Sequence, residues 1–161
     1  MVDHELAQLA EEIGRTLIAK KQVLSFAESC TGGLASALVT SIPGSSAWFD
    51  GGVVAYSNQA KQDLLQVSAE TLKQCGAVSE QVAAEMASGL LRQGRADIAV
   101  SVTGIAGPDG GTADKPVGTV CFGWASKTAP VKTRHFLFTG NRQEIRQQSV
   151  IAMLLGIKDF L

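Results

Sequence analysis

Hydrophobic and polar residues follow two alternating periodicities along the chain, which predict helices and strands in turn. Between Asp3 and Lys20, apolar residues recur every three or four positions, as on one face of an amphipathic helix capped by Asp3. Shorter apolar runs bounded by glycine, serine and asparagine are typical of buried strands. The predicted strands cover residues 23–27, 51–56, 97–103, 117–125 and 131–138.

Capping residues and glycines mark helices between these strands. Ser57 or Asn58 is placed to cap one helix, Ser68 opens a second that ends near Gly76, and Gly94 stops a third. The predicted helices cover residues 3–20, 34–38, 57–65, 68–76, 79–93 and 141–161. The alternation contains no repeat, linker or low-complexity segment.

The character and spacing of the strands predict how the sheet is built. The run 97–103 is almost continuously apolar, which favours a central strand covered by helices on both faces. Only a short connection separates 117–125 from 131–138, so these two strands are expected to pair antiparallel. The chain, residues 1–161, is therefore predicted to form a single α/β domain, a three-layer α/β/α sandwich with a mixed, mostly parallel sheet.

Composition agrees with one soluble domain of this class. The chain has 161 residues, of which 45% are hydrophobic, and a formal net charge of −1. A near-neutral chain without basic clusters gives no electrostatic support for nucleic acid as a partner. No apolar segment approaches the roughly 18 residues of a membrane span, and the acidic, polar start differs from a signal peptide. We therefore expect a cytoplasmic protein with no membrane partner.

Cysteines and histidines are too few and too scattered to predict a metal site. Cys30, Cys75 and Cys121 form no Cys-x-x-Cys pair, and we expect them to be free thiols. His4 and His135 are the only histidines, and His135 lies in an alternating strand pattern. Neither a structural metal site nor a Ser-His-Asp triad is therefore predicted.

The turn after the first predicted strand concentrates the candidate chemistry. It consists of Ser29, Cys30, Thr31, Gly32 and Gly33 and leads directly into a helix. A helix N-terminus presents free backbone N–H groups and favours negative charge, so the turn suits a phosphate or an oxyanion. Ser29 has two interpretations: a helix N-cap, or a nucleophile whose oxyanion is held by N–H groups near Gly32 and Gly33. Cys30 is the rival nucleophile, because a helix N-terminus lowers the pKa of a thiol.

A serine nucleophile needs a base, and the histidines are poorly placed to supply one. Lys61 is able to act as the base if burial lowers its pKa toward neutrality. Tyr56, the only tyrosine, ends the second predicted strand shortly before Lys61. Both side chains are expected beside Ser29, and the alternative is a partly buried tyrosine with a solvated helix lysine.

A second glycine-rich loop, residues 103–111, also follows a predicted strand. Parallel strands would bring both loops to the carboxyl edge of the sheet, where open α/β sheets bind ligands. Backbone N–H groups at Thr103, Gly104 and Gly107 suit a phosphate or a ribose, although the loop matches neither a P-loop nor a dinucleotide fingerprint. Arg142 and Arg146 are placed to bind a phosphate through their guanidinium groups. The alternative is that each is a solvated surface residue, and this alternative is favoured for Arg146.

Several blocks of the sequence resemble the CinA C-terminal domain family, in order and over essentially the whole chain. These blocks are Ala27–Gly33, Pro43–Phe49, Val54–Lys61, Gly76–Ser79, Thr103–Gly111 and Lys115–Val120. The chain resembles the stand-alone form, because the amino-terminal domain of the fused CinA proteins has no counterpart in it.

This resemblance implies hydrolysis of the carboxamide of nicotinamide mononucleotide to nicotinic acid mononucleotide and ammonia, a step of pyridine nucleotide salvage. It implies a serine–lysine arrangement with a nearby tyrosine, which falls on Ser29, Lys61 and Tyr56. The other residues that it places near the substrate are Ser46, Thr103, Gly104 and Arg142. The family needs no metal or organic cofactor and is usually oligomeric, so we expect no cofactor and a homodimer.

The resemblance and the residue chemistry together give a mechanistic hypothesis. Ser29 attacks the carboxamide carbon while Lys61, directly or through Tyr56, takes its proton. N–H groups of the Cys30–Gly33 turn hold the oxyanion, and Arg142 with the second glycine-rich loop holds the phosphoribosyl end. Two alternatives stay open: a nucleotide-binding module without catalysis in the same pocket, and an amidase for a different small amide.

Overall fold

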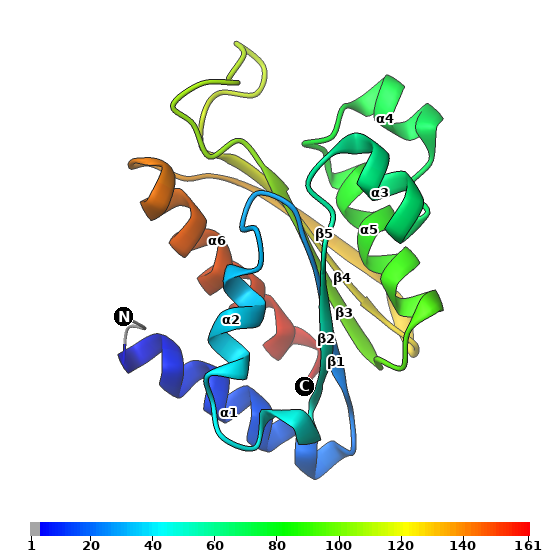
Figure 1. Ribbon diagram of the computed structural model, residues 1–161, viewed down its shortest axis with the longest axis vertical. Helices are drawn as coiled ribbons and strands as arrows, with labels where there is room; N and C mark the ends of the chain where they lie inside the picture. Colours follow the sequence, from blue (N-terminus) through cyan, green and yellow to red (C-terminus); the bar gives the residue numbers. More distant parts are fainter. Residues whose placement is uncertain (1–3) are drawn as a thin grey trace.

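The computed structural model describes residues 4–161 and contains one five-stranded sheet between two layers of helices (Figure 1). Asp3, the predicted cap of the first helix, lies outside the described residues. The strands are β1 (Leu24–Glu28), β2 (Phe49–Val54), β3 (Ile98–Gly104), β4 (Thr119–Ser126) and β5 (Ala129–Leu137). The α-helices are α1 (His4–Lys20), α2 (Leu34–Thr40), α3 (Asn58–Leu65), α4 (Ala69–Cys75), α5 (Glu80–Gln93) and α6 (Arg142–Ile157). Short 3₁₀ turns cover Ser45–Ala47 and Lys158–Phe160.

The sheet is mixed and has the strand order β2-β1-β3-β4-β5. β1 pairs in parallel with both β2 and β3, whereas β4 runs antiparallel to its neighbours β3 and β5. Every strand except β4 therefore points the same way. The predicted three-layer α/β/α fold is confirmed, as is the antiparallel pairing of the last two strands.

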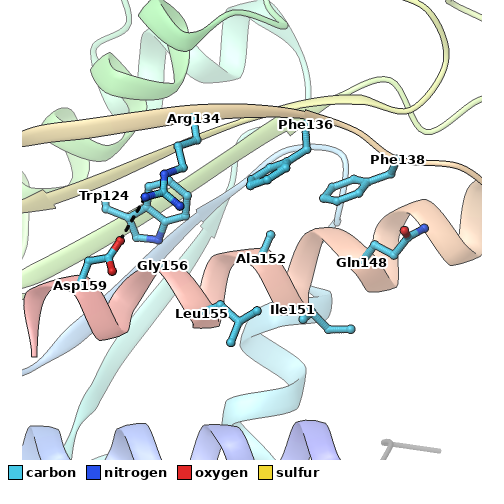
Figure 2. A pocket seen from close by; sticks show the side chains of 10 residues that line it. All are labelled: Trp124, Arg134, Phe136, Phe138, Gln148, Ile151, Ala152, Leu155, Gly156 and Asp159. Atoms are coloured by element: carbon cyan, nitrogen blue, oxygen red, sulfur yellow. Dashed lines mark ion pairs between the residues drawn. The ribbon is translucent and has the colours of Figure 1, made fainter.

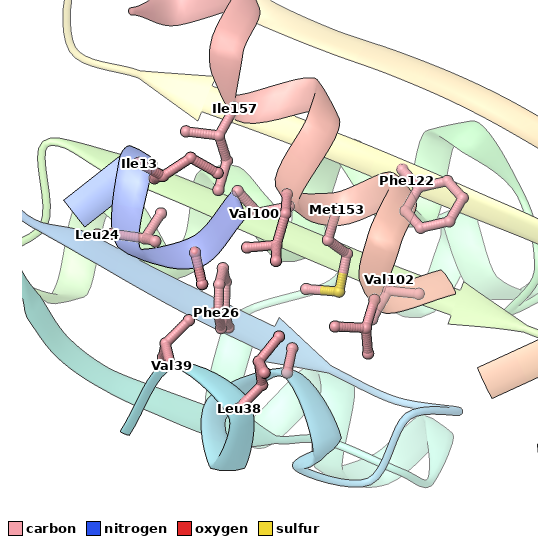
Figure 3. Close-up of a cluster of buried hydrophobic side chains, with 14 of the residues drawn as sticks. Ile13, Leu24, Phe26, Leu38, Val39, Val100, Val102, Phe122, Met153 and Ile157 are labelled. Carbon is pink, nitrogen blue, oxygen red and sulfur yellow. The ribbon is translucent and has the colours of Figure 1, made fainter. Parts of the chain in front are cut away.

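Helices cover both faces of the sheet. Figure 1 shows α1, α2 and α6 on one face and α3, α4 and α5 on the other. The larger apolar cluster lies between the sheet and helices α1, α2 and α6, and it includes Phe26, Val100 and Met153 (Figure 3). A smaller cluster on the opposite face includes Ala99 of β3 and Met86 of α5. β3 thus contributes to both clusters, as its continuous apolar run predicted.

Local interactions set the helix starts close to where the sequence places them. Ser57, Ser68, Ser79 and Asn141 each accept a backbone N–H bond through the side chain at the start of α3, α4, α5 and α6. The last helix is shorter than predicted, since it ends at Ile157 and a 3₁₀ turn follows. Within residues 4–161, no helix combines the length and the apolar character needed to cross a membrane.

The parallel strands bring distant parts of the chain to one edge of the sheet. β1 is followed at once by Ser29, β2 ends shortly before Tyr56, and β3 ends at Gly104. β5 points the same way as these strands and leads into α6, so Arg142 begins its helix at the same edge. Ser46 precedes β2 and therefore lies toward the opposite edge.

Candidate active site

A pocket of about 290 Å³ opens at the carboxyl edge of the parallel strands. The turn after β1, the start of α3, the loop after β3 and the start of α6 all contribute to its lining. The predicted site residues that line it are Ser29, Cys30, Tyr56, Lys61, Thr103, Gly104 and Arg142. The topology thus gathers side chains from four separate segments of the sequence around one cavity.

Ser29 and Lys61 are in direct contact in this pocket. Lys61 Nζ lies 3.0 Å from Ser29 Oγ and 2.9 Å from the main-chain carbonyl oxygen of Tyr56. Ser29 Oγ lies 3.4 Å from the same carbonyl oxygen. Ser57 fixes the start of α3, because its Oγ accepts the N–H of Ala60 at 3.0 Å. The lysine one turn further on is therefore held toward the serine hydroxyl.

Burial changes the chemistry of Lys61. Its side chain is only 2% exposed, so the alternative of a solvated helix lysine is wrong. Removal from water disfavours the charged ammonium and lowers the pKa of Lys61 below its ordinary value of 10.5. The neutral amine is the form that can accept a proton from a hydroxyl group. The environment of Lys61 therefore suits a general base.

Tyr56 contacts the serine–lysine pair through its main chain. Its carbonyl oxygen accepts from both Lys61 and Ser29, whereas its phenol oxygen accepts from Arg142 Nη2 at 3.3 Å. The residue is 61% exposed, so the alternative interpretation of a partly buried tyrosine is wrong. The Tyr56 phenol is therefore bonded to Arg142, while Lys61 Nζ contacts Ser29 Oγ directly.

Cys30 is a poor rival to Ser29 as nucleophile. Burial raises the pKa of its thiol to about 12, and the backbone N–H of Cys30 together with the positive charges of Arg146 and Lys61 only partly opposes that rise. The expectation that the pKa of this thiol is lowered is therefore wrong, because loss of solvation outweighs the hydrogen bond and the charges that stabilise a thiolate. The thiol stays protonated at neutral pH and is a weak nucleophile.

Glu28, to which the sequence analysis gave no role, caps α2. Its carboxylate is completely buried and accepts hydrogen bonds from five donors. Three are the backbone N–H groups of Gly33, Ala35 and Ser36, and two are the hydroxyls of Thr31 and Ser36. The N-cap position itself belongs to Gly33, with a φ of 102° that favours glycine. The interpretation of Ser29 as N-cap is therefore wrong, and its hydroxyl is left to Lys61.

Replacing Glu28 by glutamine tests this capping role. Every contact of the carboxylate is with a donor, so the amide NH2 of Glu28→Gln would face N–H and O–H groups instead of accepting from them. We expect the free energy of unfolding to fall by about 3 kcal/mol or more. Urea denaturation measures the change, with the exposed Glu70→Gln as the matched control. Equal stability of the two variants would contradict the capping role.

Hydrogen bonds inside the turn decide which of its amides stay free. Gly32 N–H donates to Ser29 O at 3.0 Å, and Gly33 N–H donates to Glu28 Oε1 at 3.2 Å. These two amides therefore hold the turn together and are not free for an oxyanion, contrary to the sequence-based interpretation. In the part of the chain that the structure describes, no other residue accepts the N–H of Cys30 or of Thr31, and the Cys30 N–H is directed to the thiol of its own side chain. The Thr31 side chain is fully buried against Glu28.

The second glycine-rich loop is fastened to the start of α5. Thr103 is buried, and its Oγ1 donates to the Ala77 carbonyl at 2.9 Å. Further along the loop, Lys115 Nζ donates to the Cys75 carbonyl at the end of α4, at 2.6 Å. Gly104 and the residues after it line the pocket between these two attachments. The loop from Gly104 onward therefore forms part of the pocket wall, and the Thr103 hydroxyl attaches the loop to the segment before α5.

The two arginines of α6 have different surroundings. Arg142 is exposed and lines the pocket, where its Nη1 donates to the Gly107 carbonyl at 2.7 Å. Arg146 is half-buried and donates to the carbonyl oxygens of Cys30 and Thr31, at 3.2 and 2.9 Å. The interpretation of Arg146 as a solvated surface residue is therefore wrong. Its partners lie far away in sequence, so periodicity carried no signal for them.

Ser46 is the predicted site residue that the fold separates from the others. It is exposed and lines a different hollow, together with Ser36 of α2 and Asp50 of β2. Ser46 was predicted from its place in a sequence block that resembles the family. Such a block does not show at which edge of the sheet a residue lies. Within this chain the expectation that Ser46 lies beside the pocket of Ser29 is wrong.

The hollow of about 340 Å³ between β5 and α6 has a different character (Figure 2). Figure 2 shows Phe136 and Phe138 above Ala152 of α6, with Arg134 paired to Asp159 at one end. None of the predicted site residues lines this hollow. Its aromatic walls offer no nucleophile, so the candidate active site is the pocket at the carboxyl edge.

The remaining thiols and histidine lie outside the candidate active site. Cys75, Cys121 and His135 line a third hollow, where the His135 ring lies 3.0 Å from Glu80. All three cysteines are free thiols, as predicted. Within residues 4–161, no set of three or more His, Cys, Asp and Glu side chains is arranged to hold a metal ion.

The fold and the pocket define a class: an open-sheet α/β protein that holds a buried lysine against a serine at the carboxyl edge of its parallel strands. The sequence model of the family described as the CinA C-terminal domain matches residues 6–161. The chain belongs to the CinA C-terminal domain family, as its sequence blocks indicated.

Relatives of nearly the same length carry a functional name. The chain is 53% identical to the nicotinamide-nucleotide amidohydrolase PncC of Enterobacter agglomerans, over 100% of this chain and 99% of that protein. It is 52% identical to the protein of that name from Escherichia coli K12, over 92% and 90% of the two chains. The crystal structure of the competence/damage inducible protein CihA from Agrobacterium tumefaciens has a TM-score of 0.96 at 42% identity, covering 99% of this chain and 97% of that one.

Proposed function

We propose that this chain is an amidase that converts nicotinamide mononucleotide and water to nicotinic acid mononucleotide and ammonia. The observation that carries the proposal is the 3.0 Å contact between Ser29 Oγ and the buried Lys61 Nζ in a pocket at the carboxyl edge. The substrate comes from the name of the relatives, the nicotinamide-nucleotide amidohydrolases. A serine with a lysine base is a chemically sufficient pair for opening an amide.

The first half of the reaction transfers the acyl group to Ser29. Its Oγ–H proton passes to neutral Lys61 Nζ while Oγ bonds to the carboxamide carbon. The tetrahedral oxyanion then collapses, the C–N bond breaks, and the Lys61 ammonium returns the proton to the leaving nitrogen. Ammonia departs, and the nicotinoyl group stays on Ser29 as an ester.

The second half restores the enzyme. Neutral Lys61 takes a proton from a water molecule as the water oxygen attacks the ester carbon. When the new tetrahedral intermediate collapses, the bond to Ser29 Oγ breaks and the proton returns to that oxygen, releasing nicotinic acid mononucleotide. In both halves we assign the oxyanion to the amides of Cys30 and Thr31, which no other residue accepts, in place of those of Gly32 and Gly33.

The other end of the substrate needs a phosphate and ribose site. Arg142 uses two of its N–H donors on Gly107 and Tyr56, which leaves further donors for an anion. Gly104 and the residues that follow it line the same pocket. We assign the phosphoribosyl moiety to this side, where its binding would position the amide at Ser29. The expected absence of a cofactor, the homodimer and the cytoplasmic location remain predictions.

Incubation of the purified protein with nicotinamide mononucleotide tests the proposal. We expect equimolar release of ammonia and nicotinic acid mononucleotide, measured by a coupled ammonia assay and by chromatography. Thermal stabilisation by the mononucleotide without any product would instead favour a non-catalytic binding module. Ammonia release from another small amide, with the mononucleotide inert, would retain the chemistry and replace the substrate.

A further inference from the structure

Arg146 lies behind the turn that carries Ser29 and is absent from the pocket lining. Its guanidinium reaches from α6 to the turn after β1, where Nε contacts Cys30 O at 3.2 Å and Nη2 contacts Thr31 O at 2.9 Å. Its remaining terminal nitrogen, Nη1, bonds Gln143 Oε1 at 3.0 Å, which steadies the side chain on its own helix. The half-buried guanidinium of Arg146 has no role in the proposed reaction steps.

The first contact acts on the amide of Thr31. In a trans peptide the C=O of one residue and the N–H of the next point in opposite directions. Arg146 Nε on Cys30 O therefore fixes the direction of the Thr31 N–H, away from the guanidinium. A cation on the carbonyl oxygen also draws electron density from the peptide, which makes the N–H a stronger donor.

The second contact reaches the amide of Cys30 through one more peptide. Arg146 Nη2 binds Thr31 O, the Gly32 N–H of that same peptide donates to Ser29 O at 3.0 Å, and Ser29 C=O shares its peptide with the Cys30 N–H. The result is a chain of hydrogen bonds that begins at the positive charge of Arg146 and ends at the peptide of the Cys30 amide. Such chains polarise one another cooperatively.

We propose that Arg146 is a positioning residue for the oxyanion site, which aims and polarises the amides of Cys30 and Thr31 through these two peptide relays. The inference rests on the proposed serine mechanism. Electrostatics at the turn support it, because burial raises the pKa of Cys30 and the charge of Arg146 opposes that rise. The same charge would favour the negative oxygen that forms beside this residue during catalysis.

The test compares Arg146→Gln with Arg134→Gln, a matched control whose arginine forms an exposed ion pair with Asp159. Two rates are measured: kcat for nicotinamide mononucleotide, and the labelling of Ser29 by a fluorophosphonate, which also forms an oxyanion. We expect Arg146→Gln to lower both rates about tenfold or more while KM changes less than about twofold. The control should match the wild type in both rates.

Further variants separate positioning from a merely structural role. We expect Arg146→Lys, which keeps the charge and a donor, to recover part of both rates, and added methylguanidinium to raise the rates of Arg146→Ala. Unchanged rates in a folded Arg146→Gln, or a rise in KM alone, would overturn the inference. The inference would also be overturned if both rates fell only in proportion to a fall in melting temperature and neither Arg146→Lys nor methylguanidinium restored them. Fluorophosphonate labelling that depends on Arg146 without hydrolysis of the mononucleotide would support the inference and reject the proposed substrate.

Discussion

The Ser29→Ala variant is expected to fold normally and to lose at least about 10³-fold in kcat for nicotinamide mononucleotide. The substitution removes one hydroxyl whose contacts are with Lys61 Nζ and the Tyr56 carbonyl, both outside the apolar clusters. Glu28 supplies the cap of α2, so the turn keeps its anchor without the serine side chain. Chemistry should therefore be lost while stability is kept. Ammonia release and a thermal melt measure the two quantities.

Cys30→Ala is the matched control, because it changes the neighbouring side chain in the same turn. A thiol whose pKa is raised to about 12 contributes no nucleophile at neutral pH, so this variant should stay within about tenfold of the wild type. Near-normal ammonia release by a folded Ser29→Ala would remove the serine from the mechanism. Inactivity confined to Cys30→Ala would assign the nucleophile to the thiol.

The sequence predicted the fold well because the signals for it are local or periodic. Ser57, Ser68 and Ser79 each bond an amide two or three residues ahead, so their positions alone mark the helix starts. The apolar run of β3 predicts burial on both faces for an equally direct reason. For Ser29 a cap was one of two interpretations, and it is excluded because the buried carboxylate of Glu28 accepts the amides that a cap would accept.

The candidate site was predicted less completely, since its groups are set by contacts across the fold. Residue types and family resemblance were enough to suggest Ser29, Lys61 and Arg142, which the parallel strands bring to one pocket. Burial of Cys30, which reverses its expected pKa shift, depends on packing that no local pattern encodes. The same holds for Arg146, whose partners belong to a turn more distant in sequence than any helical spacing reaches.

The Lys61→Met variant is expected to change both the activity and the stability of the protein. Methionine has a similar length and no titratable group, so kcat should fall by about 10³-fold or more while the buried space stays filled. In the wild type, kcat/KM should rise with pH and level off above an apparent pKa lower than that of an ordinary lysine, because only the neutral amine accepts the Ser29 proton. Lys61→Arg should be inactive as well, since a guanidinium does not deprotonate in proteins.

The stability of Lys61→Met should exceed that of the wild type at neutral pH, and the gap should close as pH rises. Folding lowers the pKa of Lys61, so the unfolded chain binds this proton more tightly than the folded one. Below the folded-state pKa the wild type bears the full cost of burying the ammonium. Between that pKa and the ordinary value of 10.5, raising the pH removes the cost, whereas the methionine variant has none to lose.

Urea denaturation of both proteins across this range measures the difference, with the exposed Lys73→Met of α4 as the pH-insensitive control. If Lys61→Met were less stable than the wild type at every pH, the buried amine would stabilise the fold, which would contradict the expected destabilisation by the buried ammonium.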